Sequence, residues 1–170
     1  MLPEYAGLVT DKFIDTIYKA SPLHDIGKVG IPDSILIKPG KLTDEEFAMM
    51  KNHVQLGYDT LAKVSKQYDG NEFLKMGSEI ALYHHEKWDG SGYLHGLSGE
   101  DIPLSARIMA LSDVYDALRS KRTYKDAFSH EKTLGIISSN KGSHFDPALV
   151  DVLLTYGEEF RLMYESISQS

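Results

Sequence analysis

The sequence contains no cysteine, which excludes disulfide bonds, cysteine-ligated zinc sites and a thiol nucleophile. It also has no apolar run near the ~20 residues that a membrane-spanning helix needs. A basic excess is missing too, because 18 Lys and Arg stand against 25 Asp and Glu, for a net charge of −7. Such a balance argues against a nucleic-acid polymer as partner. These absences are compatible with a cytoplasmic protein. A small anionic substrate remains possible, because a bound metal ion can supply positive charge locally.

The chain has 170 residues, of which 42% are hydrophobic and 25% charged, as expected for one compact domain. Strand signals are almost absent, and apolar residues recur at helical spacing. Helices are predicted over residues 8–20, 23–28, 43 to the turn at 68–71, 72–86, 103–118, 129–138 and 146–163. The segment 87–99 is rich in glycine and is predicted to be a loop. The sequence therefore predicts an all-α fold.

Two histidine-containing doublets, His24-Asp25 and His84-His85, are the first candidates for chemistry. Both fall on predicted helices, where adjacent side chains point about 100° apart. One doublet is therefore expected to direct one ligand to each of two neighbouring ions. A carboxylate can bridge two ions whereas an imidazole cannot, so Asp25 is the expected bridge. Two such doublets, with His53 as a further candidate, predict a centre with more than one metal ion.

Asp113 is a third candidate, because residues 108–118 are apolar nearly all round and predict a largely buried helix. A buried carboxylate needs a partner, which can be a metal ion, Arg107 or Arg122. Asp116 is a rival for the same role.

A lone histidine is more often a hydrogen-bonded residue than a ligand. This applies to His95, His130 and His144, and would apply to His53 taken alone. One shared metal pocket, however, explains His53, both doublets and Asp113 together.

Five segments match a known family in order. HDIGKVGIPD (24–33) resembles the HD signature of HD-GYP domains, and HHEKWDGSGYL (84–94) resembles their second signature, HHE-x-x-D-G-x-G-Y-P. IPLSARIMALSDVYDAL (102–118), RTYK (122–125) and GSHFDP (142–147) continue the match. The resemblance covers about residues 12–163.

The resemblance implies an all-helical HD-domain bundle that hydrolyses cyclic di-GMP to pGpG and often onward to GMP. It implies two or three divalent metal ions, typically iron or manganese. The positions that match family metal ligands are His24, Asp25, His53, His84, His85 and Asp113.

The resemblance also implies roles around the substrate. Lys28 matches a lysine at the substrate phosphate, and with Asp25 it is the expected catalytic pair. Tyr93 lies near the substrate, and Arg122 and Lys125 match residues that hold the distal phosphate. His144 and Asp146 (in GSHFDP) match a motif interpreted as structural.

Two departures from the family pattern stand out. The family has a further histidine ligand before the HD pair, and no histidine precedes His24 here. The chain is thus expected to be a single HD-GYP domain over 1–170 that lacks its N-terminal helix. Leu94 replaces a family proline, which frees the backbone after Tyr93. The expected partners are an upstream receiver or sensor domain, as in a response regulator, and a diguanylate-cyclase-type protein at the loop Gly90–Leu94.

Three other functions stay open at this point. The domain can be a non-catalytic regulatory module, which the missing histidine favours. It can hydrolyse another cyclic dinucleotide such as 3′,3′-cyclic GMP-AMP, since no guanine pocket is evident in the sequence. It can also be a plain helical interaction domain, although that leaves the clustered ligand types unexplained.

Overall fold

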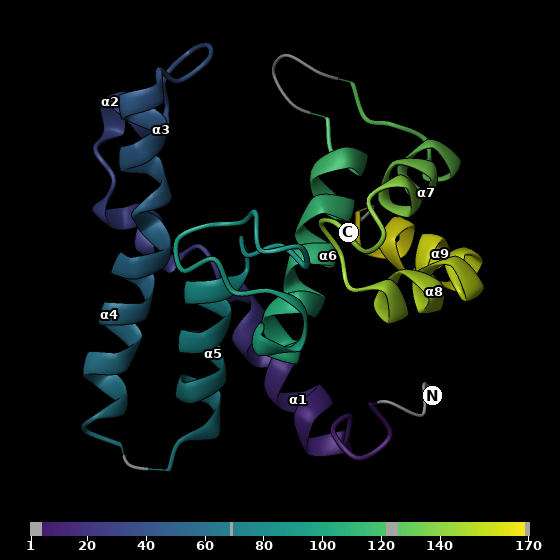
Figure 1. The fold of residues 1–170 in the computed structure, drawn as a ribbon, viewed down its shortest axis with the longest axis horizontal. Coiled ribbons are helices and arrows are strands. Elements are labelled where there is room, and N and C mark those ends of the chain that lie inside the picture. Colours follow the sequence, from purple (N-terminus) through teal and green to yellow (C-terminus); the bar gives the residue numbers. More distant parts are fainter. Residues whose placement is uncertain (1–4, 69, 122–125, 169–170) are drawn as a thin grey trace.

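The computed structural model describes residues 5–68, 70–121 and 126–168, and within these it contains helices and a single isolated β-bridge, Lys141–Phe145, but no strand. The α-helices are α1 (Asp11–Ala20), α2 (Asp33–Leu36), α3 (Asp44–Lys51), α4 (His53–Ser65), α5 (Glu72–Tyr83), α6 (Leu104–Arg119), α7 (His130–Ser139), α8 (Pro147–Thr155) and α9 (Gly157–Ser168). The 3₁₀ helices that join them within the described ranges are η2 (Ser21–Leu23), η3 (Ile26–Gly30) and η4 (Gly99–Asp101). The predicted all-α fold is confirmed (Figure 1).

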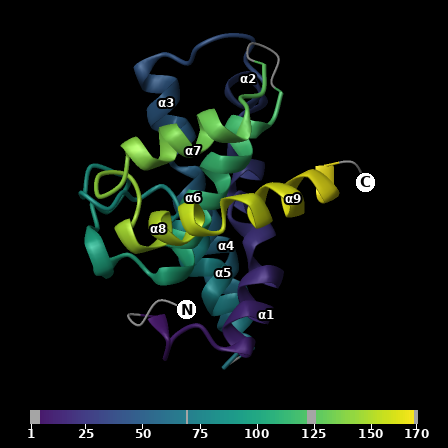
Figure 2. The same ribbon diagram turned by 90° about the vertical axis from the view of Figure 1, so that its right-hand side faces the viewer.

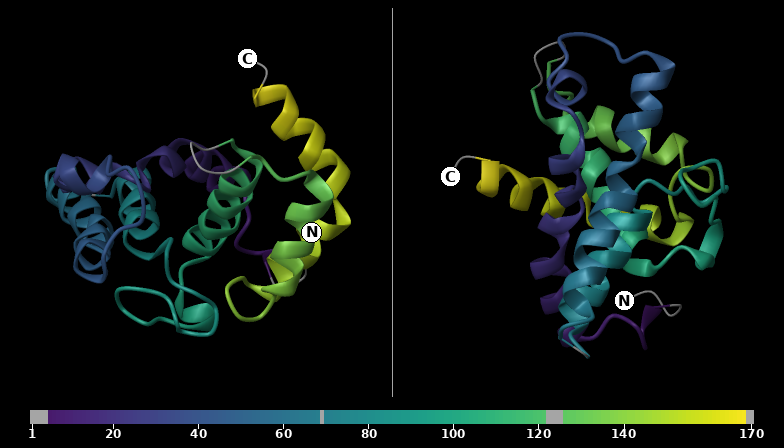
Figure 3. Two further views of the ribbon diagram at one scale, coloured as in Figure 1. Left: turned by 90° about the horizontal axis from the view of Figure 1, so that it is seen from above. Right: turned by 90° about the vertical axis from the view of Figure 1, so that its left-hand side faces the viewer.

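The helices form two packed groups (Figures 1 and 3). Helices α4 and α5 run antiparallel, and α1 and η3 pack against this pair. Helix α6 connects the pair to α7, α8 and α9 (Figure 2). The first group is held by buried Leu61, Leu74 and Ala81. The second group is held by buried Tyr115, Ile137, Phe145, Val150 and Leu153.

The predicted helix beginning at Thr43 is two helices, and this prediction of one continuous helix was wrong. Its capping box is confirmed, since Thr43 Oγ1 accepts from the Glu46 N–H at 3.2 Å and Glu46 Oε2 accepts from the Thr43 N–H at 2.8 Å. The helix breaks at Asn52, whose N–H turns back to the Met49 carbonyl at 3.1 Å. The break makes His53 the first residue of α4.

Three other boundaries also differ from the sequence prediction. The segment 146–163 is two helices, because the chain turns at Tyr156 so that buried Gly157 can pack against α7. The segment 23–28 is not an α-helix but parts of η2 and η3 with a turn between them. A one-turn helix, α2, follows Pro32, where no helix was predicted. In each case a tertiary contact or a short turn overrides the local periodicity.

Gly27 lets η3 cross α4 at its first turn. A Cβ atom at Gly27 would overlap the His53 carbonyl oxygen and the Gly57 backbone nitrogen. Only glycine permits this approach, because both opposing groups are main chain and cannot rotate away. The contact brings the turn that carries Asp25 next to the start of α4, where His53 lies.

Replacing Gly27 with alanine should therefore destabilise the protein by about 1–3 kcal/mol, the range for overpacking. It should also lower the number of metal ions bound, because Asp25 would be pushed away from His53. Urea unfolding and metal analysis of the purified variant measure both effects. Gly135→Ala is the matched control, since nothing lies within 4 Å of a Cβ there, and in the interior of α7 alanine should stabilise by up to about 1 kcal/mol. Equal behaviour of the two variants would contradict the proposed crossing.

A buried ion pair joins the N-terminal segment to the second group of helices. The Arg107 guanidinium donates to Asp146 Oδ2 at 2.6 Å and to the Tyr5 hydroxyl at 3.0 Å. The Tyr5 hydroxyl donates to the same carboxylate oxygen at 2.5 Å, and burial, with a further contribution from Asp146, raises the pKa of Tyr5 to about 12. Asp146 Oδ1 also caps α8 by accepting from the Ala148 N–H at 2.9 Å. Arg107 thus pairs with Asp146, not with Asp113.

Candidate metal centre

Three histidines share one hydrogen-bonding arrangement. The Nδ1 atom of His24 lies 2.8 Å from the Ser21 carbonyl, that of His53 lies 2.8 Å from the Met50 carbonyl, and that of His84 lies 3.0 Å from the Ile80 carbonyl. A carbonyl oxygen can only accept, so Nδ1 carries the proton in each ring. The Nε2 atoms are therefore left with a lone pair, and this second-sphere hydrogen bond is the one that orients a metal-ligating histidine.

These three Nε2 atoms converge on the Asp25 carboxylate. His24 Nε2 lies 3.3 Å from Asp25 Oδ2, while His53 and His84 Nε2 lie 3.5 and 3.8 Å from Asp25 Oδ1. The two carboxylate oxygens thus face different imidazoles. This is the disposition expected of a carboxylate that serves two neighbouring ions.

Two of these nitrogens are buried without a partner. His53 Nε2 and His84 Nε2 are inaccessible to solvent and accept no hydrogen bond from the described residues. A buried polar atom without a partner is costly and calls for an explanation. A metal ion would satisfy both lone pairs, so the residues present fit the metal ions that the sequence predicts.

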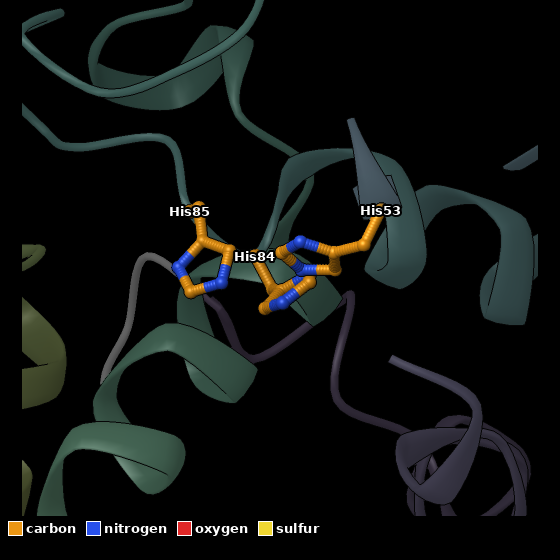
Figure 4. Close-up of side chains that lie close together, drawn as sticks. All are labelled: His53, His84 and His85. Carbon is orange, nitrogen blue, oxygen red and sulfur yellow. The ribbon is translucent and has the colours of Figure 1, made fainter. Parts of the chain in front are cut away.

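His85 completes a compact histidine group. His53, His84 and His85 each offer a ring nitrogen, and these atoms lie within 4.8 Å of one another (Figure 4). The doublet lies in the turn after α5 rather than on the helix, which corrects its predicted place. The ring centroids of His84 and His85 lie 4.1 Å apart, so both side chains belong to one group. His24 and Asp25 likewise lie between η2 and η3 and not on a helix.

The protonation states of the described ligands suit metal binding. Burial lowers the pKa of His84 to about 4 and that of His85 to about 2, and it also lowers the pKa of His53. These rings are neutral at pH 7, as metal ligands must be. Burial opposes ionisation of Asp25, but the neighbouring His24 ring and Lys28 ammonium outweigh it and hold the Asp25 pKa well below its usual range. The site therefore offers the neutral nitrogens of His53, His84 and His85 beside a carboxylate anion.

Lys28 and Tyr93 border the histidine group. The Lys28 ammonium donates to Asp25 Oδ2 at 2.5 Å. The Tyr93 ring stacks on His85, with centroids 4.8 Å apart and an interplanar angle of 28°. Burial, reinforced by the charges of Asp25 and Asp113, raises the Tyr93 pKa, so its hydroxyl remains protonated and able to donate.

Asp113 lies near this group on α6. Burial lowers the pKa of His24, but Asp25 and the Ser21 carbonyl outweigh it and raise this pKa, with a smaller contribution from the charge of Asp113. Asp113 also adds to the raised pKa of Tyr93, after burial and Asp25. Residues 108–118 are half-buried more than buried, with Ala110 and Tyr115 the fully buried positions, so the prediction of a largely buried helix was too strong. The rival Asp116 is exposed and accepts a hydrogen bond from the Ser120 hydroxyl at 3.3 Å.

The three lone histidines fall outside the metal centre. Arg122 and Lys125 lie outside the described residues. His130 pairs with the Tyr115 hydroxyl at 2.9 Å, His144 stacks on Phe145, and His95 packs against Tyr83. These are the hydrogen-bonded and packed roles expected of lone histidines.

Glu86 was given no role from the sequence, although it is the third residue of the HHE motif. It is buried, and its Oε1 accepts from the His95 N–H at 2.7 Å, which ties the end of the glycine-rich loop to the residue after the histidine doublet. Gly92 packs against the same point, where a Cβ would lie 2.5 Å from the Glu86 Cα atom. The signal available in the sequence was an acid that directly follows the paired histidines.

A family model described as HD domain matches residues 8–149 of the chain. The chain belongs to the HD domain family. The resemblance to HD-GYP domains is confirmed by curated relatives. No helix in the described part of this HD domain has the length and apolar character to cross a membrane.

Three relatives are similar over most of this HD domain. A cyclic di-GMP phosphodiesterase of Vibrio cholerae is 56% identical over 93% of the chain, which spans 32% of that protein. A 3′3′-cGAMP-specific phosphodiesterase 2 of the same organism is 50% identical over 86% of the chain and 27% of its own length. The cyclic di-GMP phosphodiesterase response regulator RpfG of Xanthomonas campestris is 48% identical over 88% of the chain and 40% of its own length. The chain thus spans about a third of the length of these relatives.

The fold is also that of a solved HD-domain protein. A crystal structure of a cyclic GMP-AMP-specific phosphodiesterase of V. cholerae superposes with a TM-score of 0.62 at 20% identity, over 92% of this chain and 41% of that one. This likeness confirms the helical HD-domain bundle.

Proposed function

We propose that this HD domain is a metal-dependent phosphodiesterase that hydrolyses cyclic di-GMP to pGpG, to GMP, or to both. The observation that carries the proposal is the convergence of the unpartnered, buried Nε2 atoms of His53 and His84 on the Asp25 carboxylate. Relatives at 48–56% identity that bear the name cyclic di-GMP phosphodiesterase support the choice of substrate.

The residues that would hold the ions are His24, Asp25, His53, His84, His85 and Asp113. Imidazole nitrogens and carboxylate oxygens without thiolate suit iron(II) or manganese(II), in a site of two or three ions. When bound, the ions would supply positive charge to the phosphoryl oxygens and lower the pKa of a water molecule. This chemistry needs no side-chain nucleophile, which agrees with a chain that has no cysteine.

The chain's own residues would bind and orient the phosphodiester. Lys28, held by Asp25 at 2.5 Å, would place its ammonium on a phosphoryl oxygen, where charge grows in the transition state. The Tyr93 hydroxyl, beside His85, would donate a hydrogen bond to the substrate. Arg122 and Lys125 are proposed to hold the second phosphate, and this placement rests on the family resemblance.

One alternative has specific support. The relative named as a 3′3′-cGAMP-specific phosphodiesterase favours cyclic GMP-AMP as a second candidate substrate. In the whole protein, we propose a receiver or sensor domain upstream, as the response-regulator relative suggests, and a cyclase-type partner at the loop Gly90–Leu94, where Leu94 is 42% exposed. A cytoplasmic location stays a prediction.

The test compares His84→Ala with His95→Ala in anaerobically purified protein supplied with iron(II) or manganese(II). Wild type should bind at least two ions and convert cyclic di-GMP to pGpG or GMP, and EDTA should stop the reaction. Loss of an outer-sphere partner alone lowers metal affinity or activity by about 10–100-fold. Loss of the ligand His84 should therefore lower turnover by more than about a hundredfold. His95→Ala, outside the histidine group, should remain active. Metal binding without turnover of either dinucleotide would instead identify a regulatory module.

A further inference from the structure

An aromatic and basic surface lies beside the metal centre and consists of Phe47 and Lys51 of α3 together with Tyr93. The Phe47 ring meets the Tyr93 ring edge to face, with centroids 6.2 Å apart and an interplanar angle of 82°. The Lys51 ammonium lies 5.2 Å from the Phe47 centroid and 5.8 Å from the Tyr93 centroid. The three side chains form one cluster, here called the α3 platform.

The α3 platform is continuous with the metal ligands. Tyr93 contacts His85 on one side and the two α3 residues on the other. The helix break at Asn52 produces this proximity, because it places the end of α3 beside His53 at the start of α4. The platform therefore stands one ring contact beyond the ligand His85.

Exposure and charge leave the α3 platform accessible to a ligand. Phe47 is 47% exposed, unusual for a large aromatic residue that borders a buried site. The acidic neighbour Glu46 is bound to Lys38 at 2.5 Å. Within the described ranges, no carboxylate lies within salt-bridge distance of the Lys51 ammonium, whose contacts there are the two rings.

We propose that the α3 platform is a base-binding subsite that favours guanine. Phe47, the exposed ring, would stack on the base face, which any nucleobase offers, and Tyr93 would border the base at its side. Lys51 would donate to the base edge. Guanine presents two acceptors there, N7 and O6, whereas adenine presents one acceptor and an amino donor that would oppose the ammonium. The inference rests on the proposed function and deepens it by naming Lys51 as the residue that selects the base.

The experiment measures binding of hydrolysis-resistant phosphorothioate analogues of cyclic di-GMP and cyclic di-AMP to the manganese-loaded protein. Lys51→Met should weaken binding of the guanine ligand by about tenfold or more, the range for a lost contact to a base edge. Binding of the adenine ligand should change much less. Lys63→Met is the control, because it removes the same charge from an exposed position on α4.

A second pair of variants tests the stacking contact. Phe47→Leu should weaken both ligands alike, since stacking on an aromatic face tolerates any base. Met49→Leu, at an exposed position of the same helix, should leave both unchanged.

Two results would overturn the subsite. Equal weakening of both ligands by Lys51→Met would indicate that the Lys51 ammonium contacts a phosphate and not a base. No weakening would show that Lys51 does not contact the ligand. The proposed function is tested separately by turnover of the unmodified dinucleotides. If the wild-type protein hydrolysed neither dinucleotide, the proposed phosphodiesterase activity would be refuted. The proposed guanine subsite would still stand if Lys51→Met selectively weakened binding of the guanine ligand.

Discussion

Asp25→Asn should lower turnover of a cyclic dinucleotide by about a thousandfold or more, the scale seen when a central catalytic group is removed, and should remove at least one metal ion per chain. The substitution keeps the shape of the side chain but removes the negative charge that faces three imidazole nitrogens at 3.3–3.8 Å. It also turns an amide group toward either the Lys28 ammonium or a histidine Nε2. Activity assays and metal analysis of purified protein measure both effects.

The control for this variant is Asp33→Asn, an equally isosteric change at an exposed residue that begins α2. Asp25 is itself partly exposed, with 31% of its side-chain surface accessible, so both variants should unfold at nearly the wild-type temperature. A fully active Asp25→Asn protein with its metal retained would refute the bridging role of Asp25.

Asp146→Ala should give the largest loss of stability among the proposed variants, about 3–5 kcal/mol. The Asp146 carboxylate is almost completely buried and accepts hydrogen bonds from Arg107, Tyr5 and the first turn of α8. Its removal would leave the Arg107 guanidinium buried without a counter-charge, and that uncompensated charge accounts for most of the expected cost. Urea unfolding, followed by the change in helical circular dichroism, measures the free energy.

Asp151→Ala is the matched control on the same helix. Asp151 pairs with Lys141 at 2.5 Å, but both side chains are exposed, at 54% and 38%. Exposed pairs contribute between about 0 and 1 kcal/mol because water screens them. If the two alanine variants unfolded at similar urea concentrations, the buried ion pair would not be holding the N-terminal segment to α6 and α8.

The helices were largely predictable because apolar spacing and caps are local signals. The capping box at Thr43 and the N-caps at Asn71 and Ser129 lie where side chains two or three residues apart decide the helix start. The break at Asn52 was not predictable in the same way. The apolar pattern continues through it, and the turn is favoured by the packing of η3 against α4.

The metal centre was predictable in its residue types and less so in its arrangement. The paired histidines and His24-Asp25 indicated metal chemistry through their clustering, and the family resemblance indicated which others belong with them. The pairing of Arg107 with Asp146, thirty-nine positions apart, left no local trace in the sequence. The same is true of the contact between Phe47 and Tyr93.

The sequence by itself determined that the protein is helical, that it has no thiol chemistry, and that its histidines and aspartates are the groups available to hold metal ions. These follow from composition, periodicity and short motifs, which act within a few residues. The tertiary structure alone decided that the Nε2 atoms of His24, His53 and His84 all face one carboxylate, and that Lys51 stands beside Tyr93. Those relations depend on the close crossing at Gly27 and on the bend at Asn52, where the packing of distant main-chain segments sets which side chains meet.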